Sequence, residues 1–96
     1  MVLEVAIIAV RPGAEEDFVN AYRGARDEVA TTPGCRSVRL TRGIESPSRF
    51  VLLVEWDSVE AHELQFRATD RFARWRAAIG PYFAAPPDVQ HAVDTG

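Results

Sequence analysis

The chain has 96 residues, of which 47% are hydrophobic and 26% charged, and its formal net charge at pH 7 is −3. All 11 basic residues are arginines scattered among 14 acidic residues, whereas a nucleic-acid-binding domain usually carries clustered positive charge. We therefore expect one small domain, residues 1–96, that does not bind nucleic acid.

Residues 2–10 (VLEVAIIAV) are rich in β-branched side chains and predict a buried strand that ends at Arg11-Pro12-Gly13. This N-terminus has no basic region before its apolar run, so it is not typical of a signal peptide. No apolar run approaches the roughly 20 residues that span a bilayer. With a single cysteine, Cys35, no intramolecular disulfide can form, and we expect a cytoplasmic protein that does not insert into a membrane.

The next element is predicted to be an amphipathic helix. Three acidic residues, 15–17, would lie in its first turn, where they interact favourably with the helix dipole. Apolar residues then recur at spacings of four, three and four, which places them on one helix face: Phe18, Tyr22, Ala25 and Val29. Thr32-Pro33-Gly34 would end the helix.

Two strands should follow. Residues 35–45 alternate, with Val38, Leu40 and Ile44 on the side that would face the core. Residues 49–56 (RFVLLVEW) are almost continuously apolar, which predicts a central strand that is buried on both faces.

A second helix is expected to start at Asp57-Ser58-Val59-Glu60, which has the D-x-x-E form of a capping box. The helix should break near residue 67, and Thr69 can cap a second segment in which Phe72, Trp75 and Ile79 share a face. Gly80-Pro81 ends that segment. Residues 88–93 (DVQHAV) alternate and predict the last strand.

The resulting order is β-α-β-β-α-β, the ferredoxin-like arrangement of the α+β class, with an antiparallel sheet and helices on one face. The other sheet face then needs a cover, because the central strand 49–56 is apolar on both sides. We predict a homodimer in which two sheets close on each other as a dimeric α+β barrel.

Several segments resemble the antibiotic biosynthesis monooxygenase family of that barrel superfamily: RPG, PGCR, EWDSVEAH, FRATDRFARWR and PYF, which together span nearly the whole chain. The resemblance implies a homodimer with one pocket per subunit between the sheet and its helices. It also implies oxidation of a small aromatic compound, such as a quinol, anthrone or polycyclic phenol, by molecular oxygen. Characterised members use no metal, flavin or haem, so no cofactor is expected.

The resemblance also assigns residues. Trp56 matches a tryptophan found at the end of the third strand in cofactor-free oxygenating members. Leu52 stands where such members can carry asparagine, and His62 stands where some carry tyrosine. The haem-degrading branch uses an asparagine on its first strand and a histidine on its last helix, and both are missing here.

Oxygenation without a cofactor requires a base that forms a substrate anion and a site that stabilises it. His62 is our candidate base, with Trp56 as its catalytic neighbour; the alternative is that His62 only packs at the sheet edge. Proton transfer from a phenol of pKa about 10 to a histidine of about 6.5 costs roughly 5 kcal/mol. Arg76 or Arg67, or a more acidic polycyclic or quinol substrate, would have to offset that cost.

The candidate substrate pocket is an apolar slot for a flat ring. Its predicted residues are Tyr22, Leu52, Phe66, Phe72, Trp75, Arg76 and Phe83. The aromatic members could equally be ordinary core residues, because a stripe at helical spacing usually reflects packing.

No metal is expected, because the chain has no H-x-x-x-H or C-x-x-C motif and His91 lies 29 residues from His62. We interpret His91 as structural or as an interface residue. Two functions stay open: a cofactor-independent monooxygenase, or a non-catalytic dimeric barrel that binds a small hydrophobic ligand or serves a stress or regulatory role.

Overall fold

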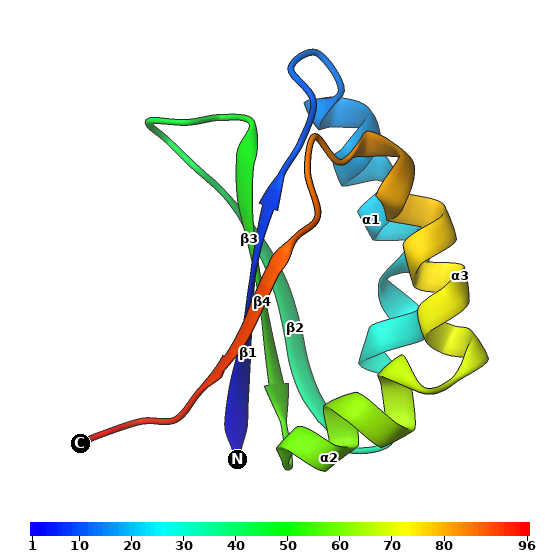
Figure 1. Cartoon of the computed structure of the whole chain (residues 1–96), viewed down its shortest axis with the longest axis vertical. Coiled ribbons are helices and arrows are strands. Elements are labelled where there is room, and N and C mark those ends of the chain that lie inside the picture. Colours follow the sequence, from blue (N-terminus) through cyan, green and yellow to red (C-terminus); the bar gives the residue numbers. More distant parts are fainter.

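Four antiparallel strands form one sheet in the order β2-β3-β1-β4 in the computed structural model, which describes residues 1–96 (Figure 1). The strands are β1 (Val2–Ala9), β2 (Cys35–Arg42), β3 (Arg49–Trp56) and β4 (Asp88–Ala92). The helical segments are α1 (Glu15–Ala30), α2 (Val59–His62), the π-helical turn η1 (Glu63–Arg67), α3 (Asp70–Ile79) and the 3-10 turn η2 (Gly80–Tyr82). This order confirms the predicted α+β ferredoxin-like fold.

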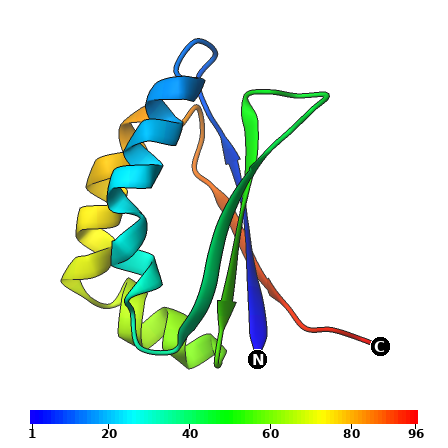
Figure 2. The same ribbon diagram turned by 180° about the vertical axis from the view of Figure 1, so that it is seen from behind.

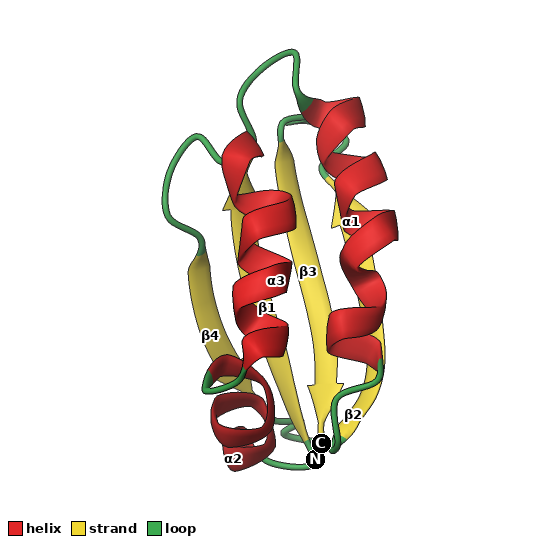
Figure 3. Cartoon of the chain, turned by 90° about the vertical axis from the view of Figure 1, so that its right-hand side faces the viewer, coloured by secondary structure: helices red, strands yellow, loops and turns green.

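All helices lie on one face of the sheet, and the opposite face is uncovered within the chain (Figure 2). Seen from the helical side, α1 and α3 run next to each other across the sheet, and α2 lies at one end (Figure 3). None of these helices combines the length and the apolar character needed to cross a membrane.

The periodicity of α1 places its apolar stripe on the sheet as predicted, with Phe18, Tyr22, Ala25 and Val29 buried. The ring of Phe18 meets that of Phe50 edge to face, with centroids 4.8 Å apart. This contact anchors α1 above β3 in a wholly apolar part of the core.

Side chains alternate along the central strands. In β3, Phe50, Leu52, Val54 and Trp56 are buried under the helices, whereas the intervening residues are only half-buried. Within the single chain β3 is thus fully buried on one face only. A homodimer that covers this second face stays a prediction.

The alternation of the second strand ends earlier than predicted. β2 stops at Arg42, and Ile44 is 88% exposed instead of facing the core. The cause is the tight turn at Gly43, where a Cβ atom would lie only 2.5 Å from the carbonyl oxygen of Ser46.

The second helical region begins at Ser58, whose hydroxyl accepts a hydrogen bond from the backbone N–H of Ala61 at 3.1 Å. The helix therefore starts where predicted, but its cap is Ser58 and not Asp57, and Ala61 cannot complete a capping box. Gly34, with φ of +90°, approaches α2 so closely that a Cβ there would lie 2.6 Å from the Cβ of Ala61. Glycine is needed at this position for both its backbone conformation and its lack of a side chain.

Candidate active site

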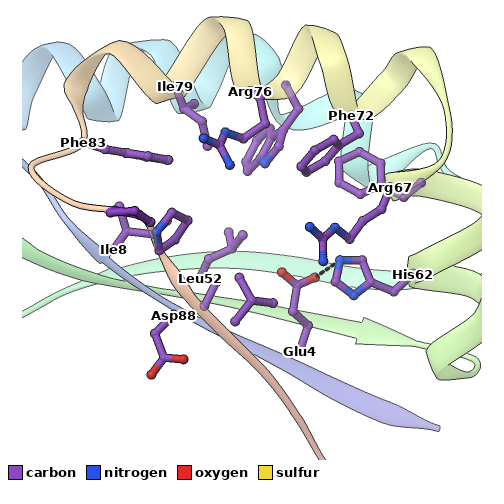
Figure 4. A pocket seen from close by; sticks show the side chains of 16 residues that line it. Glu4, Ile8, Leu52, His62, Arg67, Phe72, Arg76, Ile79, Phe83 and Asp88 are labelled. Carbon is purple, nitrogen blue, oxygen red and sulfur yellow. Dashed lines mark ion pairs between the residues drawn. The ribbon is translucent and has the colours of Figure 1, made fainter.

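A cavity of about 440 Å³ opens between the sheet and the helical layer (Figure 4). Its volume lies within the range of small-molecule sites. Aromatic and aliphatic side chains make most of its wall, and ionisable groups are set among them. The lining residues are Glu4, Ala6, Ile8, Leu52, His62, Phe66, Arg67, Phe72, Trp75, Arg76, Ile79, Phe83, Pro86, Pro87, Asp88 and Val89.

Most of the residues predicted for the pocket line this cavity. They are Leu52, His62, Phe66, Phe72, Trp75, Arg76 and Phe83, together with the candidate anion-stabilising residue Arg67. Their predicted roles toward a substrate stay predictions.

Two predicted site residues lie outside the lining. Tyr22 is buried beneath α3, where its ring meets Trp75 edge to face at 6.0 Å between centroids. Trp56 is 0% exposed and lies behind His62, with the two rings stacked at 5.1 Å. Trp56 can therefore act on a bound molecule only through its neighbours.

Glu4, on β1, brings a carboxylate to one end of the cavity, where it is only 6% exposed. Its Oε1 accepts a hydrogen bond from the indole Nε1–H of Trp56 at 3.0 Å. The Nε2 atom of His62 lies 3.3 Å from the same oxygen. A carboxylate this deeply buried is normally paired or hydrogen-bonded, and here both conditions are met.

His62, at the end of α2, is held through both ring nitrogens. Nε2 faces Glu4, and Nδ1 shares a hydrogen bond of 2.8 Å with Nε2 of His91 on β4. One consistent proton arrangement has His91 donating to His62 and His62 donating to Glu4. The sheet register explains why His91 joins this cluster, because Glu4 and His91 are direct partners across β1 and β4.

Burial dominates the ionisation of this cluster. It raises the pKa of Glu4 to about 7, an effect opposed by the hydrogen bond from Trp56 and the charge of Arg67. It lowers the pKa of His62 to about 4, helped by the positive charges of His91 and Arg67. Both shifts favour the uncharged form, as expected when water is removed from an ionisable group.

Arginines form the other polar feature of the cavity. The guanidinium of Arg67 lies 5.3 Å from the ring centre of Phe72, and that of Arg76 lies 5.3 Å from the ring centre of Phe83. These cation–π contacts hold positive charge against the aromatic wall without neutralising it. The cavity can thus receive a flat molecule on which negative charge develops.

The histidines are also closer together than their separation in sequence suggested. One possible ligand atom from each of His62, Glu63 and His91 lies within 4.8 Å of the others. The 29-residue separation of the two histidines therefore does not keep them apart in space, although their ring nitrogens already share a hydrogen bond.

Glu4 was not among the predicted site residues, and His91 was predicted to be structural or an interface residue. The sequence did contain a signal for Glu4. It alternates in step with Ala6, Ile8 and Val10, which are all buried, so its side chain points to the same sheet face. An acidic residue on the core-facing side of a strand is unusual and marks a candidate functional group.

The fold and cavity define a class: a ferredoxin-like α+β domain with a ligand-sized aromatic pocket between its sheet and helices. The family model described as "Antibiotic biosynthesis monooxygenase" matches residues 1–78. The chain belongs to the antibiotic biosynthesis monooxygenase family.

Individual relatives extend this result. The chain is 30% identical over 94 residues to the uncharacterised protein YczJ of Bacillus subtilis, covering 98% of this chain and 99% of YczJ. It is 37% identical over 54 residues to a 42.8 kDa protein of the whiE locus of Streptomyces coelicolor, a match to 56% of this chain and 14% of that protein.

Among solved structures, a Bordetella bronchiseptica protein assigned to the same monooxygenase group has 39% identity and a TM-score of 0.94, covering 98% of this chain and 96% of its own. SnoaB of Streptomyces nogalater, described as a cofactor-independent oxygenase and solved as a point mutant, has a TM-score of 0.84 with 18% identity. This match covers 99% of this chain and 93% of SnoaB. At that identity the similarity to SnoaB shows the fold alone.

Proposed function

We propose that the protein is a cofactor-independent monooxygenase that oxidises a small, flat aromatic compound of the quinol, anthrone or polycyclic phenol type with molecular oxygen. The observation that carries the proposal is the cavity itself, in which an aromatic wall surrounds the buried Glu4–His62 pair at one end and two guanidinium groups. Family membership and the fold shared with SnoaB support it.

The chemistry fits this arrangement. Ground-state oxygen reacts slowly with closed-shell organic molecules, so the substrate must first become an electron-rich anion. A buried base removes the proton, and positive charge stabilises the anion that forms. In an anthrone, the ring CH₂ group then becomes a carbonyl: one oxygen atom of O₂ enters the product and the other leaves as water, together with the two hydrogens of that CH₂.

A second function has its own supporting observation. At position 52 the wall of the cavity is the hydrocarbon side chain of Leu52, which offers no hydrogen bond to an oxygenated intermediate. A non-catalytic barrel that binds a small hydrophobic ligand would need no such group. Both functions place the ligand in the same cavity, so turnover must separate them.

We also propose that a second copy covers the free sheet face. On this face the side chains of Leu3, Val5, Ile7 and Leu53 are half-buried in the single chain. A row of aliphatic side chains on a central part of a sheet is unfavourable in water. The oligomeric state in solution, measured by light scattering, tests this proposal, and a monomer at micromolar concentration would contradict it.

Oxygen uptake tests the enzymatic proposal. Purified protein treated with chelator is mixed with anthrones and reduced naphthoquinones, autoxidation is subtracted, and incorporation of ¹⁸O₂ into the product is followed. We expect uptake above background, and a higher KM in Arg76→Leu than in the matched variant Arg74→Leu. Arg74 is exposed on the same helix but does not line the cavity, and it pairs with Glu28. Saturable ligand binding with no uptake for any compound would favour the binding protein.

A further inference from the structure

We propose that Glu4 is the group that accepts the substrate proton, and that His62 positions Glu4 and is not itself the base. This inference rests on the proposed function and deepens it by naming the proton acceptor. It departs from the expectation, based on residue type and on the family resemblance, that the histidine is the base.

The carboxylate of Glu4 is accessible from the cavity. Glu4 lines the cavity, and the two groups that bind its carboxylate, Trp56 and His62, both engage Oε1. Its second oxygen, Oε2, has no hydrogen-bond partner in the protein. Every fully buried side-chain oxygen of the chain does have a partner, so Oε2 must be accessible, and Glu4 lines the cavity. One carboxylate oxygen is thus fixed by the protein and the other is open to a bound molecule.

His62, in contrast, has no free ring nitrogen. Its Nδ1 is bonded to His91 and its Nε2 faces Glu4, while its ring is stacked on Trp56. A base must reach the proton it removes within hydrogen-bond distance, directly or through one water. His62 could do so only by giving up one of its two partners.

Polar and charged groups surround Glu4 from several elements. Trp56 approaches from β3, His62 from α2 and His91 from β4. Arg67 and Glu63 act on Glu4 from η1 with opposite signs. Two further charged groups line the same cavity, Arg76 from α3 and Asp88 from β4. Burial outweighs the hydrogen bond from Trp56 and the charge of Arg67 and raises the pKa of Glu4 to about 7, so both its ionised and its protonated form are populated near neutral pH. That balance suits a group that takes up a proton and later returns it.

The step is a simple proton transfer. The C–H or O–H bond of the substrate breaks, its proton bonds to Oε2 of Glu4, and the electron pair stays on the substrate as an enolate or phenolate. The negative charge thus moves from Glu4 to the substrate, in the cavity that Arg67 and Arg76 line. No oxidant takes part in this step, so it can be measured without oxygen.

The test is anaerobic hydrogen–deuterium exchange at the CH₂ group of anthrone in D₂O, followed by mass spectrometry, with oxygen uptake measured in parallel. Glu4→Gln keeps the shape and can still accept the Trp56 hydrogen bond, but it cannot take a proton. We expect a loss of exchange of about 100-fold or more in this variant. Glu55→Gln is the matched control, because Glu55 lies on the neighbouring strand β3 with its side chain on the opposite sheet face. It should exchange at the wild-type rate.

Two further variants separate position from chemistry. Glu4→Asp keeps the carboxylate but withdraws it by one methylene, so exchange should fall less than in Glu4→Gln. Trp56→Phe removes the hydrogen bond that lowers the pKa of Glu4, so the pH–rate profile should move to higher pH. In His62→Gln the pH–rate profile should shift, but the rate should still rise with pH as Glu4 ionises. In Glu4→Gln this rise should be absent.

The outcomes are distinct. Exchange that depends on Glu4 but occurs without any oxygen uptake would retain the proton acceptor and overturn the monooxygenase. Exchange and uptake that survive in Glu4→Gln but vanish in His62→Gln would overturn the present inference and leave the enzyme. Wild-type protein that binds anthrone without accelerating exchange would overturn the inference as well. Circular dichroism and thermal unfolding of every variant exclude loss of the fold as the cause.

Discussion

The helix-covered face of the sheet has two halves with different chemistry. Under α1, Phe18 and Phe50 meet edge to face among aliphatic side chains, and no acidic or basic side chain is buried there. Under α2 and η1, the same layer contains Glu4, His62 and His91 joined by short polar contacts. One half is filled by its own side chains, and the other lies beside the cavity.

This difference shows how a small domain can combine stability with a reactive site. A buried polar cluster costs free energy unless it is fully hydrogen-bonded, so the apolar half must supply most of the stability. The polar half can then keep groups whose pKa values are shifted far from ordinary. Changes in the two halves should therefore have different consequences.

The largest effect should come from truncation in the apolar half. Phe18→Ala removes a fully buried ring and leaves a cavity, so the free energy of unfolding should fall by about 3 to 5 kcal/mol. Phe72→Ala is the comparison in the other half, because Phe72 is only partly buried and already borders the cavity. Urea denaturation measures both. Equal losses would contradict the division into two halves.

An intermediate effect with a pH signature should come from Glu4→Gln. The pKa of Glu4 is raised from 4.5 to about 7, so the folded state holds a proton that the unfolded chain has released. The stability contributed by this raised pKa is full below 4.5 and is lost as the pH rises through 7, a change of about 3 kcal/mol. Glu4→Gln lacks this loss, so it should gain stability relative to wild type as the pH rises. The free energy of unfolding of both proteins, measured between pH 4.5 and pH 7, gives this difference in stability.

In the wild-type protein, His62 changes stability with pH in the opposite direction. Its pKa is lowered to about 4, so its stabilising contribution is present above 6.5 and is lost as the pH falls toward 4. Because His62 lies 3.3 Å from Glu4, the difference between the two curves reports on this pair together. A difference that does not change with pH would show that the carboxyl is not perturbed.

The smallest effect should come from Ile44→Ser. Ile44 follows the alternation of β2 in the sequence but is 88% exposed, so its replacement should change the free energy of unfolding by no more than about 0.5 kcal/mol. Val38→Ser, in the buried part of the same strand, provides the contrast. A large loss in Ile44→Ser would place this residue in an interface.

Local patterns were sufficient for most of the fold. The spacing of Phe18, Tyr22, Ala25 and Val29 predicted both α1 and its buried face, and the structure confirms both. The continuation of β2 to Ile44 failed because alternation does not reveal a turn that closes on backbone atoms at Gly43. These features depend on neighbours close in sequence.

The candidate site depended on contacts that are distant in sequence. Aromatic residues of α3 could be assigned to a pocket because they share one helix face. Glu4, Trp56 and His91 come from three strands, and only the sheet register brings them together around His62. The histidine was predicted from its residue type, but the atoms that occupy both of its nitrogens could not be.

His91 belongs to β4, which is at the sheet edge, pairs only with β1 and is largely exposed. Edge segments with little buried surface open at a lower free energy than the whole protein. Each such opening would break the His62–His91 hydrogen bond while leaving the apolar half of the core intact. Opening of the edge strand β4 is therefore thermodynamically linked to the position of the proton on the buried imidazole of His62. Amide hydrogen exchange along β4 would report on both.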